Sequence, residues 1–249
     1  MDVDFSGRKA IVTGSSEGIG RAIAQGLIDA GAEVLLVARR EDLLQEAAQA
    51  MGGKAGWIAI DMSRDGAAEQ IVAAAVDRFG GLDYLVNNAG LNIPGAIGAY
   101  SSADFRRMLD LNLIGTAMVT QAAVPHLARR PGAAILNISS AAGRKVFPGN
   151  GLYSATKVAI NMLTEMWAAE LAERGIRVNA ICPASTETPQ FRKVAATIEG
   201  SREHAIQLQH IHRMCAPEEL VPPALMLLSD RLGGFITGTV MDVDGGVHI

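Results

Sequence analysis

Residues Thr13–Gly20 read TGSSEGIG, follow the apolar run Lys9–Thr13 and precede a helical pattern at Ile19–Ala30. Because glycine lacks a Cβ, a turn of this composition lets the main chain approach a phosphate closely. The N-terminus of the next helix adds free N–H groups and the positive end of its dipole. A tight turn without a ligand has a similar composition, but the order strand, glycine turn and helix favours a pyrophosphate-binding turn in an α/β fold.

The same rhythm of strand and helix continues along the chain. Seven short apolar runs are expected as strands, at Lys9–Thr13, Glu33–Val37, Gly56–Ile60, Leu82–Asn87, Ala133–Ser139, Arg177–Cys182 and Thr239–Val243. Helical patterns lie between them at Ile19–Ala30, Asp42–Met51, Asp65–Phe79, Ala103–Arg129, Tyr153–Arg174 and Glu218–Ser229. Continuous apolar runs are typical of strands covered on both faces, and a repeated strand–helix–strand order requires right-handed crossovers between parallel strands. The sequence therefore predicts one doubly wound α/β domain over residues 1–249, with a parallel seven-stranded sheet and helices on both faces.

Two local features modify this prediction. Pro125 lies inside a helical pattern and is expected to kink that helix. Residues 184–214 carry no clear pattern, and a stretch of about thirty such residues in a compact domain usually forms a lid or a binding segment. We expect a loop-rich substrate lid there, and the alternative is an excursion over the surface.

The composition excludes several classes of protein. The 249 residues carry a net charge of −4, and 49% are hydrophobic against 19% charged, which is typical of a folded domain. A mildly acidic chain with 4% aromatic residues lacks the basic surface and stacking side chains of a nucleic-acid binder. No apolar run approaches the ~18 residues of a membrane span, and the acidic start MDVD is unlike a signal peptide. We therefore expect a cytoplasmic protein with no nucleic-acid or membrane partner.

The cysteines and histidines do not predict a metal site. Cys182 and Cys215 form no CxxC pair, so both are expected as reduced thiols. His210 and His212 alternate in the lid, but without a third ligand they are expected to face solvent or substrate.

The residues at the end of the second strand bear on the choice of cofactor. An acidic side chain there would bind the ribose 2′-hydroxyl of NAD, whereas this chain has Arg39 and Arg40. Two guanidinium groups suit the 2′-phosphate of NADP through charge-assisted, bidentate contacts. Glu17 in the glycine turn opposes this preference, either by repelling the phosphate or by pairing with one of the arginines. We expect NADP(H) to be favoured, with NAD as the alternative.

A second group of reactive side chains comprises Ser140, Tyr153 and Lys157. Tyr153 and Lys157 are four residues apart, so they project from one face of a helix. An ammonium beside a phenol favours the phenolate and is expected to move the tyrosine pKa from ~10 toward the working pH. Ser140 follows a predicted parallel strand, at the sheet edge where open α/β sheets bind ligands. The three residues together predict general acid–base catalysis on a substrate oxygen.

With these motifs the chain resembles the short-chain dehydrogenase/reductases of the single-domain type over nearly its whole length. The matching segments are TGSSEGIG, Asp61 after the third strand, NNAG at Asn87–Gly90, Asn112 in LDLNLIGT, NISS at Asn137–Ser140, YSATK at Tyr153–Lys157 and VDGG at Val243–Gly246. The resemblance implies a Rossmann fold and hydride transfer between a nicotinamide cofactor and a ketone or secondary alcohol. The chain departs from the family pattern at Glu17 and at Ala184, where a glycine is usual.

The resemblance also assigns a role to each site residue. Tyr153 would exchange a proton with the substrate oxygen, and Ser140 would orient the carbonyl. Lys157 would hold the nicotinamide ribose, and Asn112 would hold a water that relays protons to this lysine. Cofactor contacts are expected from Gly14, Ser16, Glu17, Gly18, Ile19, Gly20, Arg39, Arg40, Asp61, Met62, Asn88, Ala89, Gly90, Tyr153, Lys157, Pro183 and Thr188. Substrate contacts are expected from Asn92, Ser140, Phe147, Asn150, Tyr153 and Phe191.

The two longest helical patterns, Ala103–Arg129 and Tyr153–Arg174, carry more apolar residues than one sheet-facing stripe requires. The family pairs these helices between subunits, so the resemblance implies a homotetramer, with a homodimer as the alternative. Met162, Met166 and Met226 are expected in the core or in subunit contacts.

Several functions stay open at this point. Within a reductase or alcohol dehydrogenase, both reduction of a 3-oxoacyl thioester and oxidation of a sugar or polyol are compatible with the motifs. A catalytically silent dinucleotide-binding sensor or scaffold is the alternative from another class, although all four catalytic residues are present. The longer epimerase and dehydratase relatives rank last, because their glycine spacing and C-terminal region are absent.

Overall fold

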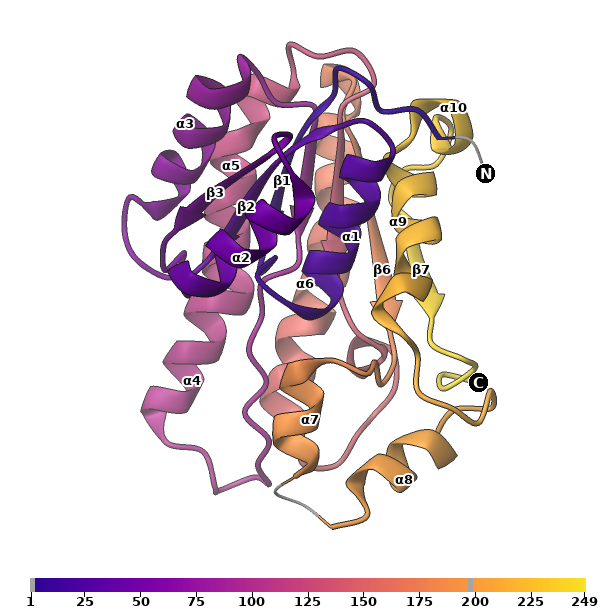
Figure 1. Cartoon of the computed structure of the whole chain (residues 1–249). Coiled ribbons are helices and arrows are strands. Elements are labelled where there is room, and N and C mark those ends of the chain that lie inside the picture. Colours follow the sequence, from indigo (N-terminus) through magenta and orange to yellow (C-terminus); the bar gives the residue numbers. More distant parts are fainter. Residues whose placement is uncertain (1–2, 197–198) are drawn as a thin grey trace.

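A parallel sheet of seven strands forms the centre of the molecule (Figure 1). The computed structural model describes residues 3–196 and 199–249, so two residues of the predicted lid, 197 and 198, lie outside the described part. The strands are β1 (Lys9–Thr13), β2 (Glu33–Ala38), β3 (Ala55–Ala59), β4 (Tyr84–Asn87), β5 (Ala134–Ile138), β6 (Arg177–Pro183) and β7 (Val240–Val243). Their order is β3-β2-β1-β4-β5-β6-β7, and every neighbouring pair is parallel. The predicted doubly wound fold is confirmed.

Helices cover both faces of this sheet. One face packs against α1 (Gly18–Asp29), α2 (Glu41–Met51) and α9 (Val221–Leu228). The other face packs against α3 (Ala67–Phe79), α5 (Thr116–Leu127) and α6 (Gly151–Leu171). Shorter helices are α4 (Ser102–Leu109), α7 (Pro189–Ala195), α8 (Ser201–Gln207) and α10 (Asp230–Gly233), with 3₁₀ turns at Ala141–Gly143, Ala172–Arg174 and Pro217–Leu220.

Alternation along each strand builds a core on either side of the sheet. In β2, Val34 and Leu36 point to the layer of α1 and α2, whereas Leu35 and Val37 point to the layer of α3 and α5. All four side chains are buried. This burial on both faces explains why the strands read as continuous apolar runs rather than as alternating ones.

The predicted helix Ala103–Arg129 is not continuous, and this prediction is wrong in detail. The α-helical segments α4 and α5 flank a π-helical stretch at Asp110–Gly115, and α5 continues through Pro125 to Leu127. A Cβ on Gly115 would lie 2.8 Å from the carbonyl oxygen of Met62, so only glycine lets the widened turn approach that strand end. Such stretches commonly mark functional sites, and this one contains Asn112.

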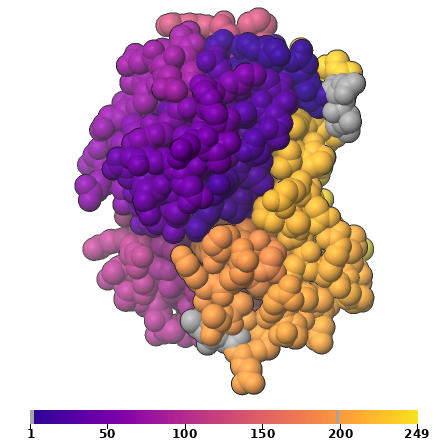
Figure 2. Space-filling view, viewed as in Figure 1, coloured from indigo at the N-terminus to yellow at the C-terminus, as the bar shows by residue number. Residues whose placement is uncertain are grey.

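The lid was expected to be rich in loops, and the structure corrects this expectation. The segment carries α7, whose N-cap is Thr188, and α8, which begins after Gly200 with a φ of +71°. Both helices have only seven residues, too few to give a clear period in the sequence. Figure 2 shows this segment in orange at the molecular surface, beside the yellow C-terminal part of the chain.

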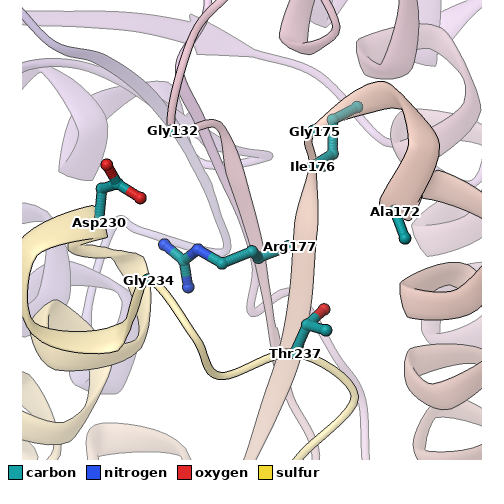
Figure 3. A pocket seen from close by; sticks show the side chains of 8 residues that line it. All are labelled: Gly132, Ala172, Gly175, Ile176, Arg177, Asp230, Gly234 and Thr237. Carbon is teal, nitrogen blue, oxygen red and sulfur yellow. The ribbon is translucent and has the colours of Figure 1, made fainter.

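A cavity of about 270 Å³ lies at the amino-terminal edge of the sheet, around Arg177 (Figure 3). Arg177 at the start of β6 is buried there, and its guanidinium donates to the carbonyl oxygens of Leu227 at 2.6 Å and Leu228 at 2.9 Å. These carbonyls belong to the last turn of α9, which has no further helical N–H to satisfy them. Arg177 therefore acts as a C-terminal cap that fixes α9 to the sheet.

None of the helices in the described part of the chain combines the length and apolarity needed to cross a bilayer.

Candidate active site

The glycine turn forms a narrow cradle at the carboxyl edge of the sheet. Gly14 and Gly18 have φ values of +65° and +61°, which favour glycine. A Cβ on Gly14 would lie 2.8 Å from the Cα of Ala89, and one on Gly18 would lie 3.2 Å from Thr188. A Cβ on Gly20 would overlap both Asn88 and the carbonyl of Gly14. The predicted cofactor residues from three separate segments therefore meet here, around a backbone surface without side chains that fits a dinucleotide pyrophosphate at the start of α1.

Hydrogen bonds tie this turn to the end of β4. The hydroxyl of Thr13 accepts from the main-chain N–H groups of Asn88 and Ala89, each at 3.0 Å. The amide of Asn88 donates to the carbonyl oxygens of Thr13 at 2.9 Å and Gly14 at 3.0 Å. Ser15 adds a bond on the other side, where its hydroxyl accepts from the N–H of Val37. The turn is thus held rigid between β2 and β4.

A second cavity, of about 490 Å³, opens beside the end of β3 and matches the expected adenosine end of the cofactor site. It is lined by Arg39, Ala59, Ile60, Asp61, Arg64, Asp65, Ala67 and Gln70. Burial raises the pKa of Asp61, but hydrogen bonds from Ser63 and the charges of Arg39 and Arg64 bring it below its usual value. Asp61 is therefore ionised, and both hydrogen bonds from Ser63 go to one of its two carboxylate oxygens, Oδ1.

The two arginines after β2 have different surroundings. Arg40 pairs with Glu17 at 2.8 Å, which is one of the two arrangements anticipated for this glutamate. Arg39 lines the cavity, and its guanidinium makes no ion pair within the part of the chain that the structure describes. Arg64 in the same wall was not anticipated, because the sequence gives no period that places it beside Arg39.

The catalytic candidates converge at the ends of β5 and β6. Tyr153 and Lys157 share one face of α6, and the Lys157 Nζ lies 5.6 Å from the centre of the Tyr153 ring. Nζ donates to the carbonyl oxygen of Ile138 at 2.8 Å and is close to Gly90. Ser140 follows β5, and its hydroxyl lies near enough to the Tyr153 phenol to act on the pKa of that group. The predicted trio is therefore brought together, beside the NNAG turn.

The ionisation of this group differs from expectation. Burial raises the pKa of Tyr153, and the hydrogen bond from Ser140 only partly offsets it. Burial lowers the pKa of Lys157 from 10.5 to about 8. The expectation that the ammonium would lower the tyrosine pKa is therefore wrong for the protein groups alone, because removal from water penalises both charged forms.

Asn112 is buried in the π-helical stretch, and its side chain makes three hydrogen bonds within the protein. Its Oδ1 accepts from the N–H of Leu91 at 2.7 Å, and its Nδ2 donates to the carbonyl oxygen of Leu91 at 2.9 Å and to Thr156 at 3.1 Å. The side chain thus clamps the segment after NNAG to α6.

The predicted substrate residues are only partly brought together. Asn92 donates from Nδ2 to the Oδ1 of Asn150 at 3.0 Å, and Gly95 pairs with Gly149 through a main-chain hydrogen bond of 2.8 Å. The segment after NNAG therefore lies along the segment before Tyr153. Phe147 is in that second segment, and Phe191 is in the first turn of α7, bonded through its N–H to Thr188.

Cys182 is a further residue of this region that sequence reasoning missed. It is buried at the end of β6, 3.8 Å from Asn161, and its charge would act on both Tyr153 and Lys157. Burial raises the pKa of its thiol, so it is neutral at physiological pH. An apolar run ending in ICP gave no sign that this thiol would lie near Tyr153 and Lys157. Pro183 and Met62, both expected near the cofactor, lie at the end of β6 and just after β3.

The geometry can be compared with known proteins. The family model described as Enoyl-(Acyl carrier protein) reductase matches residues 14–248. The 3-oxoacyl-[acyl-carrier-protein] reductase FabG of Thermotoga maritima is 32% identical over 98% of this chain and 99% of its own length.

The chain belongs to the short-chain dehydrogenase/reductase family.

Solved structures of this family agree with the fold in detail. L-Sorbose reductase from Gluconobacter frateurii, complexed with NADPH and L-sorbose, superposes with a TM-score of 0.93 at 31% identity, covering 100% of this chain and 99% of that one. A 3-ketoacyl-(acyl-carrier-protein) reductase from Brucella melitensis, complexed with NADH, gives 0.90 at 32% identity over 98% and 99% of the two chains. The present short-chain dehydrogenase/reductase is therefore an NAD(P)-dependent oxidoreductase that acts on a ketone or an alcohol.

The buried Lys157 should titrate at a pKa of about 8. With ¹³C at lysine Cε, one NMR resonance should titrate near this pH and be absent from the Lys157→Met variant. Between about pH 8 and 10.5, Lys157 has lost its proton in the folded chain but keeps it in the unfolded chain. The free energy of unfolding of the wild type, measured relative to that of Lys157→Met, should therefore rise with pH in this range, by up to about 3 kcal/mol. Lysine resonances that all titrate near ~10.4 would contradict this expectation.

Proposed function

We propose that this enzyme reduces a ketone to a secondary alcohol with NADPH and that Tyr153 donates the proton. The observation that carries the proposal is the convergence of Ser140, Tyr153 and Lys157 beside the glycine cradle, on one edge of the sheet. The cofactor, when bound, supplies the hydride at C4 of its nicotinamide. The protein supplies the position, the proton and the polarisation of the carbonyl.

The raised pKa of Tyr153 suits the reductive direction. A phenol that stays protonated at neutral pH is ready to donate to the oxygen that gains charge as the carbonyl is reduced. Ser140 donates a hydrogen bond to the same oxygen and orients it. Lys157 supplies a positive charge beside the ring and would hold the nicotinamide ribose, and a water held by Asn112 would return a proton to Lys157.

Replacement of Tyr153 by phenylalanine tests the proton donor. Tyr153→Phe should lower kcat by about 10²–10⁴-fold, because the reacting oxygen loses its acid, while NADPH affinity measured by nucleotide fluorescence stays nearly unchanged. Ser154→Ala changes a neighbouring hydroxyl on the same helix and should retain turnover. Substantial activity in Tyr153→Phe would rule out the assignment.

The preference for NADPH rests on the charges around the adenosine cavity. Arg39 lines the cavity without an ion-pair partner in the described residues, whereas Arg40 is held by Glu17 at 2.8 Å. We assign the 2′-phosphate to Arg39, with Arg40 available only when its pair with Glu17 opens. We therefore expect a moderate preference for NADP(H) over NAD(H), because Glu17 already neutralises the charge of Arg40 and only Arg39 is left for the phosphate.

Two substitutions should move this preference in opposite directions. Arg39→Asp should lower the ratio of kcat/KM for NADPH over NADH by about 100-fold, since a charge-assisted contact is replaced by repulsion. Glu17→Gln should raise the same ratio, because it releases Arg40 toward the phosphate. The ratio is measured with one carbonyl substrate and both nucleotides, and an Arg39→Asp ratio equal to that of wild type would disprove the role of Arg39.

The substrate we propose is a mid-sized ketone with a polar substituent, either a 3-oxoacyl thioester or a keto form of a sugar or polyol. Its contacts are Asn92 and Asn150, whose amides are bonded to each other beside Tyr153, and Phe147 and Phe191 on the two flanking segments. A panel of ketones and alcohols from both classes, followed at the nicotinamide absorbance, would choose between them. A catalytically silent binding protein would bind NADPH and turn over none of them.

We further propose that the enzyme is a cytoplasmic homotetramer. On α6, Val158, Met162 and Met166 recur every fourth residue and are 53%, 57% and 48% exposed, so these methionines are not core residues. Met118 on α5 and Ile114 just before it add to the exposed apolar side chains. Met226, in contrast, packs partly buried against the core.

In sedimentation velocity, Met162→Glu should dissociate the assembly, because it places a charge in the exposed apolar row of α6. A wild-type protein that is a stable monomer at micromolar concentration would overturn the proposal.

A further inference from the structure

The segment between Ser140 and Tyr153 is tied to the C-terminal end of the chain. Arg144 makes a bidentate ion pair with Asp242, with Nε–Oδ1 at 3.1 Å and Nη2–Oδ2 at 3.2 Å. The next residue, Lys145, donates from Nζ to the carbonyl oxygen of Val247 at 2.6 Å. These two contacts join residues that are 98 and 102 positions apart in the sequence, and both begin close to Ser140.

The C-terminal tail, Asp242–Ile249, is itself fixed in one conformation. The carboxylate of Asp244 accepts from the N–H of Gly246 at 2.9 Å, from the N–H of His248 at 3.0 Å and from the Nδ1 of His248 at 2.8 Å. Asp244 and Val247 are buried, and Gly245 and Gly246 have φ values of +62° and +87°. The tail is thus a folded acceptor for Arg144 and Lys145 rather than a frayed end.

The other side of the same tail touches the end of the lid. The N–H of Ile211 donates to the carbonyl oxygen of Gly245 at 2.9 Å. His210 packs against Gly246 so closely that a Cβ there would lie 3.1 Å from the Cβ of His210. Figure 2 shows the lid in orange against the yellow C-terminal part. One short tail therefore contacts both segments that were expected to bind substrate.

The contacts of Arg144 with Asp242 and of Lys145 with Val247, together called the tether, also lie close to the reacting groups. Asp242 is paired with Cys182 where β7 runs beside β6, and Arg144 ends the short turn that begins after Ser140. Asp242 is 14% exposed and Arg144 is 40% exposed, so the pair is partly shielded from solvent.

A metal ion is the competing use of these groups. Ligand atoms of Asp242, Asp244 and His248 lie within 4.8 Å of one another, which is close enough to hold a cation. However, both oxygens of Asp242 are taken by Arg144, and Asp244 is taken by the tail's own N–H groups and by His248. The guanidinium of Arg144, about 3 Å from the Asp242 carboxylate, would repel a cation bound to that carboxylate. The contacts of the tether therefore explain this cluster better than a metal site does.

We propose that the C-terminal tail is a clasp that positions the substrate segment against the lid, with Arg144–Asp242 as its positioning pair. A bidentate arginine–carboxylate contact fixes direction as well as distance, unlike most exposed ion pairs. Through it the tail sets the orientation of the segment from Ser140 to Asn150 and, through Ile211, the resting position of the lid. The effect on turnover rests on the proposed reductase function, whereas the mechanical link does not.

The link is tested first by hydrogen–deuterium exchange, which does not depend on turnover. In Asp242→Asn, exchange should become faster at the amides of Gly143 and Lys145, which bond within the substrate segment, and at Ile211 in the lid. Arg144→Lys, which keeps the charge and loses the bidentate geometry, should show the same pattern more weakly. Arg21→Gln, which breaks an exposed ion pair between α1 and α2 with Glu46, is the matched control and should change none of these amides. Unchanged exchange at all of these sites in Asp242→Asn would overturn the clasp.

Kinetics then test its role in positioning. Asp242→Asn and Arg144→Gln should each lower kcat/KM for the carbonyl about tenfold, since a small misplacement of the substrate segment costs catalysis, with NADPH affinity and thermal midpoint close to wild type. The double variant should be no worse than either single variant, because the two residues act as one pair. Values of kcat/KM within about twofold of wild type, or fully additive losses, would exclude the positioning role. A wild-type protein inactive with every carbonyl would instead refute the proposed function, while the exchange result would still decide the clasp.

Discussion

The hydrogen bonds between Thr13 and the Asn88–Ala89 turn are the constraint on which the rest of this active site depends. They hold the glycine turn of β1 against the end of β4, where both strands stop side by side at the sheet edge. The turn needs glycine because the neighbouring backbone leaves no space for a Cβ at Gly14 or Gly20. A buried side chain that satisfies two N–H groups at once gives this junction its rigidity, since leaving those groups unpaired would cost about 1–3 kcal/mol each.

A second polar network extends this rigidity to β5 and α6, next to Ser140, Tyr153 and Lys157. Asn87 donates to Asn137 on the adjacent strand at 2.9 Å, and Asn137 donates to Thr164 on α6 at 2.9 Å. These side chains are buried, so each bond is made in a medium of low dielectric and is correspondingly directional. The network fixes the rotation of α6 against the sheet, and that rotation determines where Tyr153 and Lys157 point.

Much of the fold was predictable because its signals are local. The seven strands were found within two residues at each end, since strands buried on both faces are continuous apolar runs bounded by glycine and helical periods. The π-helical stretch at Asp110–Gly115 was not predictable. It arises because Asn112 bonds to Leu91 and Gly115 abuts Met62, contacts between residues far apart in the chain. The helices α7 and α8 of the lid were not predicted, because each has only seven residues and is too short to show a helical period in the sequence.

The sequence by itself determined the family, the cradle of glycines and the side chains that we propose as catalytic, because these depend on residue type and on spacing within one turn or helix. Tertiary structure alone decided the ionisation and the partners of those groups. It buried Tyr153 and Lys157 enough to shift both toward their neutral forms, paired Glu17 with Arg40 rather than Arg39, and joined Arg144 to Asp242. Desolvation and long-range charge contacts depend on what the folded chain places nearby, and no local pattern of residues encodes them.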